Sequence, residues 1–475
     1  MRSTDLALAL CAALLSACGS NAASPTGPAG GSNAASPTAP AGASMTPAER
    51  AAFALLSPSV LPAPPPDVTN RFADDARAAA FGQKLFFEPG FAGRLTDGDN
   101  DGTINALGSE GETGKVSCAG CHVADAGFLD NRTLGKEISL GAGWGRRRAP
   151  SLLDVGQAKL VMWDGRHDTL YNQPFGPLES PVEMNSSRLY TAQRLYQLHR
   201  PEYEALFGAL PPFDDTVRFP TVTAEQTGCT PSTVDPEPTC NGVGHGLPGD
   251  KAEFDSLASA DQTAVTQVVV NMGKALGAYQ RLLHCGPSRF DAWVAGQANA
   301  LSESEQRGAK LFVGRGQCVN CHSGPFLSDE KFHNVGLRPG IVAVVFIDQD
   351  DHGAAVGLAA AVADPLNSRG SFSDGDDGRL NQPLTAELEG AFRTPMLRCG
   401  ARRPTFMHTG QFDSLAEVVS FFARGGDHFG FPGKNELTPL ELDEQDELDL
   451  VAFLGSLEGP GPPAELRRNP LQPAR

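Results

Sequence analysis

The short motif Cys-x-x-Cys-His occurs twice in this chain of 475 residues, at 118–122 and 318–322, and it constrains the fold more than any other feature. Two thiols and an adjacent imidazole are the groups that attach a c-type haem, because the thiols form thioethers with the haem vinyls and the imidazole binds the iron. A zinc ribbon would need four ligands at each site, and a thiol redox pair would not need the histidine. The motifs therefore predict two covalently bound haems. The predicted haem-binding residues are Cys118, Cys121, His122, Cys318, Cys321 and His322.

The sequence around the two motifs is repeated as well. Gly82–Phe87 and Gly308–Val313 precede the motifs, have similar sequences and both read as the end of a helix. After the motifs, Arg148–Leu170 aligns with Arg393–Leu415 without a gap. Such a duplication predicts a mainly α fold, made of two tandem c-type cytochrome domains with one covalent haem each and long loops.

The N-terminal residues indicate export. Arg2, a short apolar run and small residues are typical of a signal peptide, and Leu15–Cys18 resembles a bacterial lipobox that would make Cys18 a lipidated residue. An ordinary signal peptide with an incidental cysteine is the alternative. The lipobox predicts a periplasmic lipoprotein anchored to the outer membrane of a Gram-negative bacterium. The following stretch, rich in Pro, Gly, Ala and Ser, cannot bury apolar area and is expected to be a disordered tether.

Four segments are therefore expected along the chain. They are a signal peptide at 1–17, a tether at 18–69, an N-terminal haem domain at 70–265 and a C-terminal haem domain at 266–475.

Net charge and the remaining cysteines add two further expectations. The formal charge of −18 makes the chain a poor nucleic-acid binder but a reasonable partner for a basic protein. Free thiols are uncommon in an oxidising compartment. Cys229 and Cys240 bracket a Pro-rich loop and could close it, which would leave Cys285 and Cys399 as a second pair.

The C-terminal half contains a candidate for the second axial ligand of its haem. Met407 lies in the segment Thr405–Gly410, and a methionine thioether is the ligand that raises the potential of His/Met cytochromes c. His408 is a rival ligand, and Met407 as a core residue is a further alternative. The repeat places Met162 at the position of Met407, so the same question arises for the first haem.

The N-terminal half contains groups suited to other chemistry. An indole such as that of Trp163 can relay electrons when it lies between two haems. An amide and a carboxylate, such as those of Gln173 and Glu183, can handle the protons of a bound peroxide if they lie over an open iron.

These motifs resemble the bacterial di-haem cytochrome c peroxidase family, which includes the methylamine-dehydrogenase maturation enzyme. The resemblance extends over about 70–458 and rests on both haem motifs, Trp163–Arg166, the spacing of Gln173 from Glu183, and Phe406–His408. It implies an enzyme that reduces hydrogen peroxide with electrons from a small carrier, either a cytochrome c or a cupredoxin.

The same resemblance assigns roles to the two halves. The C-terminal haem would accept electrons, and the N-terminal haem would be peroxidatic. Trp163 would lie between them, with Gln173 and Glu183 in the distal pocket. Family members are often dimers, so the resemblance also raises homodimerisation as an expectation.

The chain departs from the family in two ways. Typical members have a distal histidine after the first haem motif, but here no histidine occurs between His122 and His167. We therefore expect a five-coordinate N-terminal haem that needs no reductive activation, unless Met162 closes it. The maturation enzyme has a tyrosine ligand where this chain has Met407, which favours a peroxidase over an enzyme that oxidises side chains of a partner protein. A non-enzymatic electron-transfer cytochrome, with both irons closed, is the remaining alternative.

An acidic insertion in the first module resembles the opening of a calcium-binding loop. Asp97, Asp99 and Asp101 alternate, and Gly102 permits a sharp turn, but the twelfth position is Gly108 instead of glutamate. A calcium site and a solvated acidic loop are both compatible with this pattern.

Overall fold

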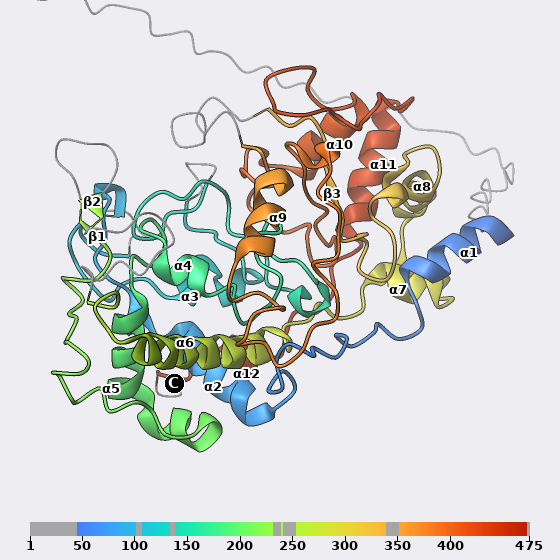
Figure 1. Ribbon diagram of the computed structural model, residues 1–475. Helices are drawn as coiled ribbons and strands as arrows, with labels where there is room; N and C mark the ends of the chain where they lie inside the picture. Colours follow the sequence, from blue (N-terminus) through green and yellow to red (C-terminus); the bar gives the residue numbers. More distant parts are fainter. Residues whose placement is uncertain are drawn as a thin grey trace, which may run out of the picture. The chain divides into compact units, whose positions relative to one another are not determined.

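A computed structural model describes residues 45–100, 107–133, 138–230, 239–240, 253–338 and 351–472, and its described part is mainly helical (Figure 1). The helices are α1 (Pro47–Leu56), α2 (Ala76–Phe87), α3 (Cys118–Cys121), α4 (Phe175–Glu179), α5 (Arg188–Phe207), α6 (Ser259–Gln280), α7 (Arg289–Val294), α8 (Glu303–Val313), α9 (Ala354–Ala363), α10 (Leu415–Ala423), α11 (Glu444–Gly455) and α12 (Ala464–Arg467). Two antiparallel strand pairs accompany them: β1 (Cys229–Thr230) with β2 (Thr239–Cys240), and β3 (Phe332–His333) with β4 (Phe392–Arg393). Within these residues no helix is long and apolar enough to cross a membrane.

The helix that precedes each haem motif packs against a long partner helix. Helix α2 lies on α6, and α8 lies on α11 (Figure 1). Each helix pair packs closely because a glycine, which has no Cβ, faces the backbone of the partner helix. A Cβ added to Gly82 would lie 2.0 Å from the Ala275 carbonyl oxygen, and a Cβ added to Gly308 would lie 1.9 Å from the Asp449 carbonyl oxygen. The two glycines are equivalent in the repeat, so the duplication extends to helix packing.

Each helix pair has its own apolar core. The repeat-equivalent Phe86 and Phe312 are both fully buried, one in each core. Burying a phenylalanine side chain contributes about 1.5–3 kcal/mol. The repeated sequence therefore stabilises two similar helical layers beside the two haem motifs.

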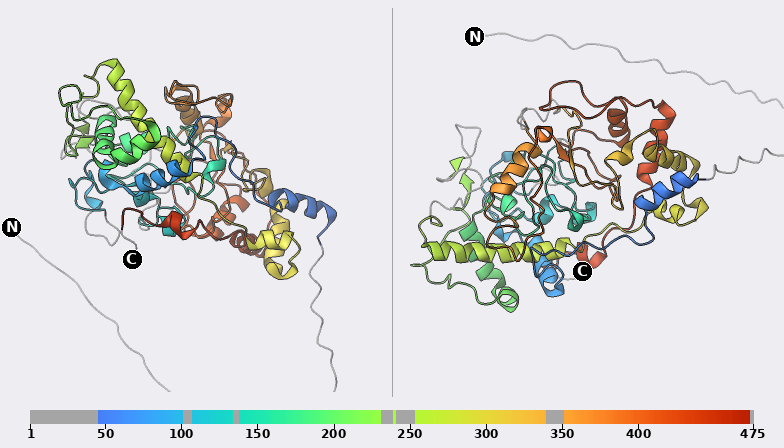
Figure 2. Two further views of the ribbon diagram at one scale, coloured as in Figure 1. Left: turned by 90° about the horizontal axis from the view of Figure 1, so that it is seen from below. Right: turned by 45° about the vertical axis from the view of Figure 1, so that its right-hand side comes forward.

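Each end of the described chain packs on the helical layer of the other half. Helix α1 contacts α7 and α8, as both views of Figure 2 show. Segment 464–468 lies on the other layer, where the Tyr279 hydroxyl donates to the Leu466 carbonyl oxygen (2.5 Å) and the Gln83 amide donates to that of Glu465 (2.7 Å).

Two predicted segment boundaries need correction. The tether at 18–69 is wrong for its C-terminal part, because α1 is helical and its Phe53 and Leu56 are buried. The boundary between residues 265 and 266 falls inside α6, a helix that is buried over most of its length against α2 and α5. Residues 1–44, which include the predicted signal peptide and Cys18, lie outside the described residues.

The repeated backbone is clearest in the turns that follow the haem motifs. Val161 pairs with His167 and Phe406 pairs with Phe412 in isolated antiparallel bridges at equivalent positions. Within these turns Met162 and Met407 (both 70°) and Gly165 and Gly410 (73° and 71°) have left-handed φ angles. Asp154 and Cys399, which precede the turns at matching positions, also have left-handed φ angles (60° and 53°).

The two halves meet through a reciprocal pair of backbone hydrogen bonds. The Arg148 N–H donates to the His408 carbonyl oxygen, and the Arg393 N–H donates to that of Trp163, both at 2.8 Å. Arg148 is equivalent to Arg393 in the repeat, and Trp163 to His408. The halves are therefore joined by contacts that each half makes in the same way.

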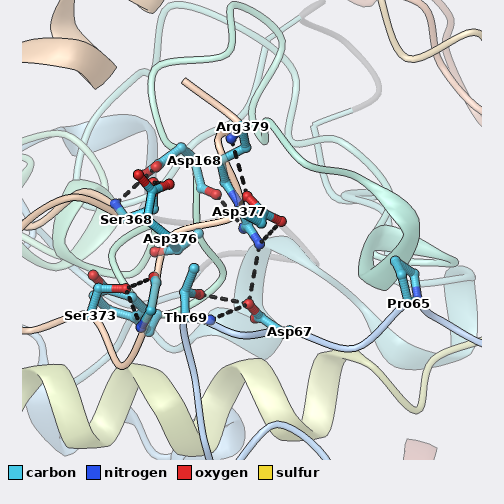
Figure 3. Close-up of polar contacts among 12 residues, drawn as sticks. Pro65, Asp67, Thr69, Asp168, Ser368, Ser373, Asp376, Asp377 and Arg379 are labelled. Atoms are coloured by element: carbon cyan, nitrogen blue, oxygen red, sulfur yellow. Dashed lines mark hydrogen bonds and ion pairs between the residues drawn. The ribbon is translucent and has the colours of Figure 1, made fainter. Parts of the chain in front are cut away.

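A polar network holds the segment that follows Trp163. The Arg379 guanidinium donates to the Asp168 carbonyl oxygen (2.6 Å) and pairs with Asp67 (3.2 Å) and Asp377 (2.9 Å). The Ser368 N–H donates to the Asp168 carboxylate (2.9 Å), and Figure 3 shows these groups converging from three distant parts of the chain. The network fixes the start of the segment that leads to Gln173.

Cys285 and Cys399 form a disulfide, as the sequence suggested, with a Cα–Cα distance of 5.9 Å. It links the chain after α6 to the turn that precedes Met407. Cys229 and Cys240 are opposite each other in the register of β1 and β2, and their disulfide stays a prediction.

Candidate active site

The two motif histidines are oriented in the same way. The Nδ1 atom of His122 lies 3.3 Å from the Phe128 carbonyl oxygen, and that of His322 lies 2.8 Å from the Leu327 carbonyl oxygen. Phe128 and Leu327 both have left-handed backbone angles (57° and 52°), which turn their carbonyls towards the imidazoles. A histidine that donates from Nδ1 to a carbonyl presents Nε2 to a metal, so both rings are prepared as iron ligands.

The surrounding residues fit a bound haem. Unlike Cys285 and Cys399, the four motif thiols are free of disulfides, so they can form thioethers. Pro150, Trp163, Pro395 and Arg403 line one hollow between the two motif regions. Burial, reinforced by the neighbouring Arg393, lowers the pKa of Arg403 to about 10, and its buried Nε has no hydrogen-bond partner among the described residues. A buried guanidinium N–H without a partner favours a nearby anion, and haem propionates would supply one.

The structure places Met407 and His408 in different surroundings. Met407 is half-buried at the tip of its turn. The His408 ring is buried and stacked on Phe392, with ring centroids 3.6 Å apart. Burial lowers the pKa of His408 to about 3, so the ring stays neutral. The stack engages His408 in packing and favours Met407 as the iron ligand, which stays a prediction.

Glu183 lies close to the first haem motif. Burial, followed by the charges of Cys121 and then of Glu183, raises the pKa of the Cys118 thiol to about 12, so the carboxylate is within electrostatic range of this thiol. Burial also raises the pKa of Glu183 itself, partly offset by the charge of Arg166. A carboxyl group with a raised pKa is suited to exchanging protons near neutral pH.

Gln173 is aimed at Met162. Its side-chain Nε2 lies 3.5 Å from the Met162 sulfur. Helix α4 begins two residues after Gln173, and the segment behind that helix leads to Glu183. Both predicted distal groups thus come from one continuous segment of the first half.

Trp163 lies at the junction of the halves. Its side chain is buried, and the indole N–H donates to the Arg148 carbonyl oxygen (2.7 Å). The centroid of its ring lies 6.4 Å from that of His408. This position agrees with the predicted relay role, which no contact tests directly.

Sequence reasoning missed an ion network at the same junction. Arg147 donates to Asp164 and to Asp351, both at 2.6 Å, and its guanidinium lies over the Phe392 ring. The two carboxylates hold the pKa of Arg147 well above its usual range despite burial. Asp164 follows Trp163 directly, which was the available signal, but nothing in the sequence indicated a partner 204 residues from Arg147.

The candidate calcium loop is only partly described. The Asp97 carboxylate accepts the Asp99 N–H (2.8 Å), and Asp99 accepts the Trp144 indole N–H (2.8 Å). Asp101 lies outside the described residues, and among the described ones no three His, Cys, Asp or Glu side chains form a group that could hold a metal. Calcium binding here stays a prediction.

Comparison with known proteins gives consistent matches. Residues 76–227 match the family model of the di-haem cytochrome c peroxidases. The methylamine utilization protein MauG of Methylorubrum extorquens is 27% identical, over 80% of this chain and 77% of its own length. The cytochrome c551 peroxidase of Pseudomonas aeruginosa is 26% identical, over 83% and 81%. The cytochrome-c peroxidase IdrP1 of Denitromonas iodatirespirans is 27% identical, over 87% and 89%.

Solved structures support the fold alone. The di-haem peroxidase BthA of Burkholderia thailandensis superposes with a TM-score of 0.55 at 22% identity, over 81% of this chain and 86% of that one. A MauG-like protein associated with microbial copper homeostasis gives the same TM-score and identity, over 87% and 98%.

Proposed function

We propose, from the premise that this chain belongs to the di-haem cytochrome c peroxidase family, that it reduces hydrogen peroxide to water with electrons from a small periplasmic redox protein. The predicted resemblance is confirmed, and the protein is an oxidoreductase that acts on peroxide. In our proposal, His322 and Met407 would hold the haem that accepts electrons, and His122 would hold the haem that receives them and reacts with peroxide. The observation that supports this assignment is Glu183, whose charge acts on the Cys118 thiol of the first motif, and Gln173 comes from the same segment of the first half.

Two residues of the first half would act on the bound peroxide, one by proton transfer and one by orienting it. The haem supplies an iron that binds peroxide and exchanges electrons with it. Glu183 would take a proton from one peroxide oxygen at its carboxylate and return it to the other, which leaves as water when the O–O bond breaks. The remaining oxygen would become the second water with two electrons from the donor and two protons. Burial raises the pKa of this carboxyl, which favours its protonated form relative to an exposed glutamate. Of the two N–H groups of the Gln173 amide, one donates to Met162 and the other would orient the bound oxygen atoms.

Residues of the second half and the junction serve electron transfer. Thioether ligation by Met407 would raise the potential of the second haem and suit it to accept electrons from a carrier. Trp163 is buried where the reciprocal hydrogen bonds join the halves, which supports a relay between the two haems. The indole N–H bond to the Arg148 carbonyl oxygen would hold the ring in place.

The experiment that tests this proposal is the substitution Glu183→Gln. General acid–base help typically contributes about 10²–10⁴-fold, so peroxidase activity should fall by that order while both haems remain attached. The exposed Glu444→Gln on α11 is the matched control and should keep full activity. Steady-state peroxide turnover and haem content are measured together. Near-full activity of Glu183→Gln would remove Glu183 from the mechanism.

Three finer points belong to the same proposal. The chain is exported and anchored to the outer membrane through Cys18, which mass spectrometry of the mature protein would test.

The protein binds one calcium through Asp97, Asp99 and Asp101. Removing the calcium with a chelator should therefore lower the midpoint of thermal unfolding. Homodimerisation is supported only by the family and would be measured by light scattering.

A further inference from the structure

Met162 shares the backbone geometry of the candidate iron ligand in the other half. Met162 and Met407 both have a φ of 70°, and each lies in a turn closed by an equivalent bridge. Left-handed angles are uncommon for residues other than glycine, asparagine and aspartate, so their occurrence at both methionines calls for a reason. A turn that presents Met407 to its iron would present Met162 to the first haem in the same manner.

The Met162 sulfur is held by a residue of the proposed peroxide site. The Gln173 amide donates to this sulfur at 3.5 Å, and the Met162 side chain is only half-buried. A thioether sulfur is a weak acceptor, so the contact is easily exchanged for a better one. In this arrangement the sulfur and the peroxide of the proposed reaction compete for one iron position.

We propose that Met162 is a reversible cap of the first haem. While Gln173 holds the sulfur, the iron is open to peroxide, and when the amide releases it, the sulfur takes the sixth iron position. The exchange breaks one amide–sulfur hydrogen bond and forms one iron–sulfur bond, and no electron or proton is transferred. The cap rests on the proposed function and adds a regulation of that site, in a chain with no histidine between His122 and His167 to serve as a distal ligand.

The test uses the full-length holoprotein and the spin state of the first haem, read by electron paramagnetic resonance and by the near-infrared sulfur-to-iron band. Gln173→Leu removes the amide and should raise the ratio of low-spin to high-spin first haem on the order of fivefold, the effect of one neutral hydrogen bond. Met162→Leu should be high-spin at this haem. The double variant should also be high-spin, because the ligand itself is gone.

Two control variants make the spectra interpretable. Met407→Leu should change only the signal of the second haem and so assigns it. Met184→Leu replaces a buried methionine next to Glu183 and should leave both signals unchanged. Haem content is measured for every variant, so that a misfolded one is recognised.

Each remaining outcome decides the question. A first haem that stays high-spin in Gln173→Leu overturns the cap, as does a double variant that stays low-spin. A wild-type protein that is already low-spin supports the cap if Met162→Leu opens the iron, and overturns it if the iron stays closed. If Met162→Leu is open but does not react with peroxide, the proposed function fails while the cap stands.

Discussion

The charge of His167 is controlled by burial. Its side chain is 11% exposed, and its Nδ1 lies 3.9 Å from the Asp364 carboxylate, too far for a hydrogen bond. Burial, reinforced by Arg166 and opposed by Asp164, lowers the pKa of His167 to about 3. The folded protein therefore keeps this ring neutral under conditions in which an unfolded chain would protonate it.

Stability should depend on pH through this residue. An unfolded histidine takes up a proton near pH 6.5, whereas folded His167 does so near its lowered pKa of about 3. The free energy of unfolding should therefore fall as pH decreases from about 6.5, by up to about 1.4 kcal/mol per pH unit, and should not change through this residue above that range. His167→Phe introduces the residue that the second half has at this position, Phe412, and should reduce the slope.

Urea unfolding at several pH values between about 4.5 and 7.5 measures this effect. The exposed His428→Phe is the control and should leave the slope unchanged. An unchanged slope in His167→Phe would show that other groups cause the acid sensitivity.

At the residue scale, the sequence was informative where a motif defines the chemistry. Cysteine and histidine spacing predicted the haem attachment, and the repeat identified Met162 as the counterpart of Met407. Arg403 and Arg147 could not be recognised, because nothing local distinguishes a buried arginine from a solvated one. Their burial is set by packing between segments far apart in the chain.

Among the elements, α1 should contribute to global stability. Phe53 is fully buried and packs edge-on against Phe290 (5.9 Å) and Trp293 (5.3 Å). Phe53→Ala should lower the free energy of unfolding by about 3–5 kcal/mol, because it leaves a cavity in the core of the second layer. Leu55→Ala on the same helix is 72% exposed before substitution and should cost little. Equal stabilities of the two variants would restore the view that this segment is only a tether.

The sequence did contain the signal for α1, although composition obscured it. Thr46 caps the helix, Pro47 is at its first position and Glu49 completes a capping box, the pattern expected at a helix start. The surrounding Pro- and Ala-rich stretch suggested disorder. The misplaced boundary at 265 has another cause: α6 is buried over most of its length, so no change in apolar periodicity indicates where one layer ends.

At the scale of the whole molecule, the two halves form one interdependent unit. The first described helix packs on the second layer and segment 464–468 packs on the first, while the disulfide of Cys285 and Cys399 adds a covalent link. The reciprocal bonds of Arg148 and Arg393 lie at the centre of this arrangement. The duplication could be predicted from the sequence, but this exchange of ends could not, because the segments involved are not part of the repeat.

The net charge of −18 should govern the encounter with the electron donor. A basic cytochrome c would be attracted over distances comparable to the Debye length, so its rate of electron delivery should fall by about tenfold or more between low salt and roughly 0.5 M salt. Stopped-flow reduction of the second haem at increasing ionic strength measures this. A small uncharged reductant is the control and should show little salt dependence. If the basic cytochrome delivers electrons at a rate that salt does not change, the docking surface is not set by net charge, and an apolar contact with a copper protein becomes the better hypothesis.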